Sequence, residues 1–230
     1  MHYKKLFFIV SSFLLIATQL FAREGSSQFS GVLYLGASNA DCTLWSGSTL
    51  GIMLDGDPTL WSSPSTEAND AGGLGFSYRY FATENLALCT GLNVIYKSFT
   101  VNYPAYTAID DLSLDISNTY VIIPAGMRIY FNYFYLGGGL YYGLAGTAQV
   151  EVTYTTNYGT TTEKTDEDFD DDFGLYVDLG LDIPLSDIIS LDLGIRYEYG
   201  LKSVYSNEDD IITDIKMKAL LFNVGLCFTL

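Results

Sequence analysis

The last eleven residues constrain the fold most strongly, because they alternate strictly between apolar and small or polar side chains. One face would carry Leu220, Phe222, Val224, Leu226, Phe228 and Leu230, and the other Leu221, Asn223, Gly225, Cys227 and Thr229. A period of two predicts a β-strand with two different faces and excludes a helix. About ten residues is also the length that a tilted strand needs to cross a bilayer. An ordinary strand of a soluble sandwich is the alternative, so the rest of the chain has to decide.

The N-terminal residues predict a secretory signal peptide. Lys4 and Lys5 precede an apolar run over residues 6–16, and Ala22 stands before a cleavage site ahead of Arg23. The run is short for a membrane-spanning helix, although an uncleaved anchor is the alternative. We therefore expect a signal peptide over residues 1–22 and one mature domain over residues 23–230.

Charge and histidine content limit the chemistry of the mature chain. Cleavage would remove Lys4, Lys5 and the only histidine, His2, but no acid, so the formal charge of −16 would become −18. Such a charge argues against nucleic-acid partners, whose phosphates must be neutralised by basic side chains. The loss of histidine excludes Ser-His and Cys-His nucleophiles and imidazole metal sites. We expect a protein that is not an enzyme, with no cofactor and no metal centre.

Seven alternating segments precede the C-terminal strand, over residues 28–38, 73–81, 86–97, 119–131, 134–150, 173–183 and 189–201. The connections between strands alternate between long and short. The long ones are polar and cover residues 39–70, 104–115, 153–172 and 203–214, and the short turns lie at 83–85, 132–133 and 184–187. This rhythm predicts an all-β protein, an eight-stranded antiparallel up-and-down barrel with short turns at one end and four long loops at the other. A mean hydropathy of +0.20 fits a barrel with an apolar outer surface.

The charged residues of the predicted strands all fall on the parity opposite the apolar face. Seven of them form the expected network: Arg79, Lys97, Arg128, Asp178, Asp192, Arg196 and Glu198. An Arg or Lys at mid-depth on a lipid-facing surface would cost ~2–4 kcal/mol, so we expect these side chains to point into the lumen. An eight-stranded barrel has an interior that side chains just fill, which predicts a charge network that plugs it. Acid–base catalysis by Asp178 and Asp192 is the alternative to a structural ion-pair network.

Four C-terminal positions, Asn223, Gly225, Phe228 and Leu230, resemble the assembly signal of bacterial outer-membrane barrels. The predicted mature chain as a whole is similar to the small eight-stranded barrels of the OmpX, OmpA transmembrane-domain and OmpW type. It departs from many of them in ending on leucine where an aromatic residue is common. The resemblance implies an integral protein of the bacterial outer membrane that contacts lipid and the barrel assembly machinery. It also implies contact with a host or environmental surface ligand.

Three functions remain open at this point. The first is a non-enzymatic barrel that displays acidic surface loops for structural or surface-interaction roles. The second, implied by the resemblance to OmpW-type barrels, is a narrow channel for small, mainly hydrophobic molecules. The third is a soluble periplasmic lipocalin-like binder, which would bury the apolar parity inside.

The long loops contain two further features. Seven acids lie within residues 163–172, and Asp166, Asp168, Asp170 and Asp172 could hold Ca²⁺ through carboxylate oxygens, with a solvated loop as the alternative. Trp45 and Trp61 could be adhesive aromatics or could pack the first loop onto the barrel rim. The three cysteines, Cys42, Cys89 and Cys227, do not form an even framework, so we expect free thiols.

Overall fold

The computed structural model describes residues 25–44, 65–103, 111–205 and 212–230. These residues form ten strands, and no helix among them is long and apolar enough to cross a membrane. The strands are β1 (Ser27–Leu44), β2 (Ser65–Thr83), β3 (Leu86–Tyr103), β4 (Asp111–Phe131), β5 (Phe134–Ala145), β6 (Thr147–Thr156), β7 (Gly159–Asp168), β8 (Asp172–Pro184), β9 (Ile189–Gly200) and β10 (Ile212–Thr229).

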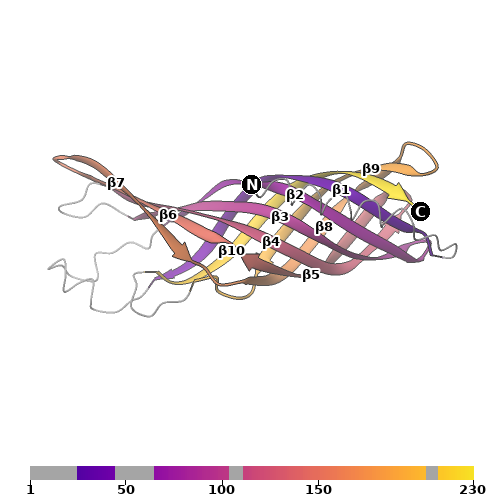
Figure 1. The fold of residues 1–230 in the computed structure, drawn as a ribbon, viewed down its shortest axis with the longest axis horizontal. Helices are drawn as coiled ribbons and strands as arrows, with labels where there is room; N and C mark the ends of the chain where they lie inside the picture. Colours follow the sequence, from indigo (N-terminus) through magenta and orange to yellow (C-terminus); the bar gives the residue numbers. More distant parts are fainter. Residues whose placement is uncertain (1–24, 45–64, 104–110, 206–211) are drawn as a thin grey trace, which may run out of the picture.

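Eight of the strands close into a barrel, in the order β3-β2-β1-β10-β9-β8-β5-β4, and a β3–β4 pairing completes the ring. Neighbouring strands of the ring are antiparallel, and the first strand pairs with the last from Gln28↔Thr229 upward. The predicted up-and-down barrel is confirmed. Short turns gather at one end, hereafter the turn end, and β6 and β7 project from the other, the loop end (Figure 1).

Several strands are longer at the loop end than the sequence predicted. β1 continues to Leu44, β2 begins at Ser65, β4 at Asp111 and β10 at Ile212, so the long connections are shorter than expected. Strands of 18 to 21 residues are about twice the length that crosses a bilayer. The prediction missed these extensions because their alternation is interrupted by polar residues on the outer face.

The predicted third loop over residues 153–172 is wrong, since most of it forms the β6–β7 hairpin. β5 ends at Ala145 instead of continuing to Val150, and β6 then follows β4 from the Ser117↔Gln149 pair. Cross-strand threonine hydroxyls stabilise the hairpin, among them Thr153 and Thr162, whose Oγ1 atoms lie 3.2 Å apart. The Thr-rich segment therefore forms a strand pair instead of a loop, because its hydroxyls meet across the ladder.

The two faces of the strands follow the predicted parity. On β10 the apolar residues Leu220, Phe222, Val224, Leu226 and Phe228 are exposed on the outside, whereas their neighbours face the lumen and are buried. Matching exposed leucines, isoleucines and aromatics on the other ring strands form an apolar band around the barrel. The lipocalin-like hypothesis, which put this parity inside, is wrong.

The polarity of the wall reverses above the apolar band. On β10, Lys216 and Lys218 face outward while Ile215 and Met217 are buried inside, each 1% exposed. On β3, Phe99 and Val101 face inward and are fully buried. The loop-end part of β1–β4 and β10, together with β6 and β7, is called the extension. It has an apolar interior and a polar exterior, as a protein surrounded by water requires.

Candidate functional site

An ion-pair cluster fills the lumen near the turn end, with members from β2, β4, β8 and β9. They are Arg79, Arg128, Arg196, Asp178, Asp182 and Asp192. Arg128 joins two of the aspartates, because its Nη2 lies 2.6 Å from Asp178 Oδ2 and its Nη1 lies 2.8 Å from Asp192 Oδ2. Both aspartates have a second arginine, since Arg196 reaches Asp178 at 3.3 Å and Arg79 contacts Asp192. Three positive and three negative charges therefore balance within this cluster.

A second cluster lies above the first, where Lys97 meets Asp172 and Glu198 in a fully buried trio. Lys97 Nζ is 3.3 Å from Asp172 Oδ2 and 3.0 Å from Glu198 Oε2. The Glu198 contact is an ion pair whose angle lies outside hydrogen-bond geometry. The Tyr141 hydroxyl donates to Asp172 Oδ2 at 3.0 Å, and Lys97 also lies over the rings of Tyr141 and Tyr120. Lys97 is thus paired with two buried carboxylates.

Glycines on the inner wall make room for the large lumen side chains. A Cβ atom on Gly194 would lie 2.3 Å from the Tyr135 hydroxyl, and one on Gly180 would lie 2.5 Å from it. The same hydroxyl donates to Asp192 Oδ1 at 2.7 Å, so its position is set by the charge cluster. The Gly-rich inner faces of β5, β8 and β9 therefore serve packing, because a Cβ there would collide with the network.

An apolar core fills the lumen of the extension. Its buried members include Phe99, Val101, Ile116, Val204, Ile215 and Met217. Phe169 and Tyr205 pack against it, with ring centroids 5.6 Å apart. From the turn end upward, the lumen thus contains an arginine–aspartate cluster, a lysine trio and an apolar core.

Comparison with known proteins agrees with this architecture. Residues 10–228 match the family model of the outer membrane protein β-barrel domain. The chain belongs to this family. No curated protein sequence matches it.

Among solved structures, this family member is similar to the outer membrane protein OprG from Pseudomonas aeruginosa, with 11% identity over 90% of this chain and 96% of OprG and a TM-score of 0.44. It is also similar to Ail of Yersinia pestis in complex with the heparin analogue sucrose octasulfate, with 15% identity over 90% and 100% of the two chains and a TM-score of 0.38. The outer membrane protease OmpT from Escherichia coli matches with 11% identity over 93% and 100% and a TM-score of 0.43.

Membership of this family identifies the membrane in which the barrel lies. The protein is an integral protein of the bacterial outer membrane, and the apolar band is its lipid-facing surface. In such barrels the short turns face the periplasm and the longer connections face the cell exterior. The extension is therefore extracellular, and the turn end opens toward the periplasm.

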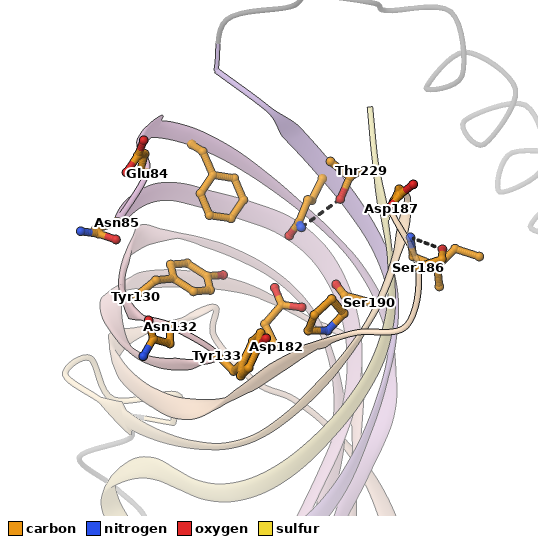
Figure 2. Close-up of a pocket in the computed structure, with 14 residues that line it drawn as sticks. Glu84, Asn85, Tyr130, Asn132, Tyr133, Asp182, Ser186, Asp187, Ser190 and Thr229 are labelled. Carbon is orange, nitrogen blue, oxygen red and sulfur yellow. Dashed lines mark hydrogen bonds between the residues drawn. The ribbon is translucent and has the colours of Figure 1, made fainter.

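The turn end of this outer-membrane barrel opens into a polar mouth (Figure 2). Asp182 and Ser190 lie in it, opposite Tyr130. Two of the lining residues contact Arg79, because its Nη1 donates to Asp182 Oδ2 at 3.0 Å and to the Tyr130 hydroxyl at 3.1 Å. At the rim, Gln28 Nε2 donates to Thr229 Oγ1 at 3.1 Å. The mouth thus ends on the arginine–aspartate cluster.

The acidic segment does not gather into the calcium site suggested by the sequence. Asp166 and Asp168 lie on β7, Asp170 pairs with Lys202 at 3.4 Å, and Asp172 points into the lumen toward Lys97. No group of three metal-ligating side chains occurs among the residues that the structure describes. Asp172 lies apart from the other three carboxylates because it begins β8 with its side chain on the inner face.

The four residues of the predicted assembly signal lie along the seam between β10 and β1. Asn223 is buried in the lumen and donates to Asp192 Oδ1 at 3.2 Å, and Gly225 faces inward beside it. Phe228 is exposed on the lipid-facing side, and the backbone N–H of Leu230 donates to the Ser27 carbonyl at 2.9 Å. These residues therefore both close the barrel and present an aromatic side chain outward.

Other predicted features are placed as follows. Cys42, Cys89 and Cys227 are free. Trp45, Trp61 and the predicted signal peptide lie outside the described residues. The predicted network left out Asp172, which was assigned to a loop, and Asp182, which lies on the inner face of β8 and pairs with Arg79. It also missed the tyrosines, because alternation predicts which way a ring points but not which carboxylate its hydroxyl reaches.

Proposed function

We propose that this protein is a non-enzymatic outer-membrane scaffold that displays an acidic extracellular surface for binding a host or environmental partner. The observation that carries the proposal is the β6–β7 hairpin, which projects beyond the ring (Figure 1). β7 ends the sheet order, so one edge of its backbone has no strand partner within the described part of the chain. An open edge can pair with an extended segment of another protein.

The charge of the hairpin supports a basic partner. β7 carries Glu163, Asp166, Glu167 and Asp168 against one basic residue, Lys164, which pairs with Glu151 on β6 at 2.6 Å. Complementary charge increases association rates and disfavours partners of like charge. The hairpin surface is therefore suited to a basic extended segment.

The carboxylates of the lumen support a structural role for the charge network. Asp178 and Asp192, the candidates for acid–base chemistry, are each 1% exposed and each contact two arginines. A carboxylate held in this way has no substrate-accessible side. We infer that the seven predicted lumen residues stabilise the barrel interior.

The alternative is a narrow channel for small, mainly hydrophobic molecules. The apolar core of the extension would suit such a solute, but it continues downward into the lysine trio and the arginine–aspartate cluster. An apolar molecule would have to displace buried ion pairs, whose separation is costly. The filled lumen favours the scaffold.

Conductance across planar bilayers tests the choice directly. A scaffold with a filled lumen gives no resolved unitary steps, whereas a channel for ions or solutes gives discrete ones, and discrete steps would overturn the proposal. A second measurement compares adhesion of bacteria that express the full chain with adhesion of bacteria that express a variant lacking residues 149–166. Loss of adhesion with an unchanged heat-modifiable barrel is the expected result.

We infer in addition that Asn223, Gly225, Phe228 and Leu230 are recognised by the barrel assembly machinery. The outward position of Phe228 at the β10–β1 seam supports this role. Phe228→Ala should lower the amount of folded protein in the outer membrane while leaving the refolding yield in detergent unchanged. Equal losses in both assays would assign Phe228 to barrel stability instead.

A further inference from the structure

A groove runs across the outer surface of the extension, between β3 and the β6–β7 hairpin. Its lining includes Tyr96, Asn69, Ser117, Asn118, Gln149 and Asp166. Tyr96 is the outward aromatic of β3 at the level where the apolar band gives way to polar residues. The groove therefore lies directly above the lipid, on the extracellular side.

Strand register brings its polar side chains together. Ser98, Ser117, Gln149 and Asp166 form one row across β3, β4, β6 and β7, because each is the direct partner of the next. Thr100, Asp115, Glu151 and Lys164 form the adjacent row. Directly paired side chains share one face of a sheet and lie within contact distance. Hydroxyl, amide and carboxylate groups thus converge on one surface.

The charges of the groove disfavour an anionic ligand. Its one basic residue, Lys164, is already paired with Glu151 at 2.6 Å. Asp115 accepts a hydrogen bond from the Thr100 hydroxyl, and Asp166 adds a further carboxylate. The ligand must therefore donate hydrogen bonds to carboxylates and bring no negative charge of its own.

Asn118 marks the inner limit of the groove. It is 3% exposed and lies among the lining residues beside Thr147, but it pairs with Lys97 across the β3–β4 ladder, so its side chain shares the inward parity of Tyr120. Its Oδ1 accepts from the backbone N–H of Thr119 at 2.7 Å. The ligand contacts therefore come from the outward row, in which Gln149 offers the amide.

We propose that this groove binds a sugar that carries free hydroxyls and no acidic group, with the ring against Tyr96. Each sugar hydroxyl both donates and accepts, which matches a surface where carboxylates alternate with amides and hydroxyls. The half-exposed Tyr96 presents the apolar face on which a sugar ring packs, and the Gln149 amide donates to a ring or hydroxyl oxygen. The inference rests on the proposed surface role and adds a sugar to the basic partner proposed for the open edge of β7.

Saturation-transfer NMR on the full-length protein in phospholipid nanodiscs tests the inference. The probes are glucose, galactose, N-acetylglucosamine and glucosamine, with a sulfated disaccharide as the anionic counter-probe. At least one uncharged or amino sugar should receive saturation, and the sulfated sugar should not. Gln149→Ala and Tyr96→Leu should each weaken binding by about tenfold, which corresponds to one lost hydrogen bond or stacking contact.

Thr160→Ala is the matched control, because Thr160 lies on β7 beyond the groove and pairs with Thr155. It should leave binding unchanged, and heat-modifiable gel migration should verify that each variant is folded. Absence of transfer to all four uncharged and amino sugars, preference for the sulfated disaccharide, or equal weakening by Thr160→Ala would overturn the inference. None of these results alters the conductance test, so failure of the sugar site is distinguishable from failure of the scaffold proposal.

The source of the sugar is resolved by a second set of nanodiscs that contains outer-leaflet glycolipid. If the glycolipid suppresses saturation of the free sugar, the groove holds a sugar of the surrounding membrane. If saturation persists, the groove takes a free saccharide. Both results support the site and differ only in its occupant.

Discussion

Replacing Lys97 by methionine should destabilise the barrel more than replacing Arg128, although Arg128 makes more contacts. Arg128 pairs with both Asp178 and Asp192, but each aspartate still contacts another arginine when Arg128 is replaced. Lys97 is the only cation paired with Asp172 and Glu198 among the described residues. Breaking a buried ion pair costs about 3–5 kcal/mol when it leaves an uncompensated charge. We expect about 3 kcal/mol for Arg128→Met and about 5 kcal/mol for Lys97→Met.

The free energies of unfolding can be measured with guanidinium on protein refolded into lipid vesicles, followed by circular dichroism and heat-modifiable gel migration. The control is the triple variant Lys97→Met, Asp172→Asn, Glu198→Gln, which replaces the whole trio by neutral groups and should recover most of the lost stability. If Lys97→Met is no more destabilising than Arg128→Met, the argument from the number of remaining cations is wrong. If the triple variant is as unstable as Lys97→Met, packing around the lysine stem matters more than charge.

Three further substitutions test packing and facing in the same unfolding assay. Gly194→Ala should lower the free energy of unfolding by about 1–3 kcal/mol because its Cβ meets the Tyr135 hydroxyl. Adding Tyr135→Phe should relieve part of that loss, so strictly additive effects of the two substitutions would contradict the clash. Phe99→Ala should lower the free energy of unfolding by about 3–5 kcal/mol by opening a cavity in the core of the extension. Tyr158→Ala on the hairpin tip should change it little, and similar effects of the two substitutions would mean that the extension is not packed. Phe76→Arg should cost about 2–4 kcal/mol and impair membrane insertion, as judged by carbonate extraction, while Tyr158→Arg should insert normally.

Local alternation along the chain was enough to predict most of the ring. Within Leu220–Leu230 a period of two determines which side chains share a face, and the presence of charges on only one parity determines which face meets lipid. The direction of Arg79, Lys97, Arg128, Asp178, Asp192, Arg196 and Glu198 follows from these two facts alone. The alternation of long and short connections likewise determined the antiparallel order.

Sequence reasoning failed where the environment of the chain changes. Within the apolar band the barrel is surrounded by lipid, and apolar side chains face outward. In the extension it is surrounded by water, and apolar residues such as Phe99 and Met217 face inward. The parity of the apolar residues therefore switches within a single strand, which obscured the extensions of β1, β2, β4 and β10. The threonines of β6 and β7 have no apolar alternation at all, and their hairpin is recognisable only once cross-strand hydroxyl pairs are seen.

The sequence by itself determined an outer-membrane barrel with charges inside and apolar side chains outside, because facing depends only on local periodicity and on the solvent at each surface. Only the tertiary structure decided which charges meet. Asp192 joins Arg79 and Arg128 across the lumen, while Lys97 alone serves Asp172 and Glu198. It also placed Asn118, Gln149 and Tyr96 around one groove. Such contacts depend on register and barrel closure, which join residues far apart in the chain, and no local pattern encodes them.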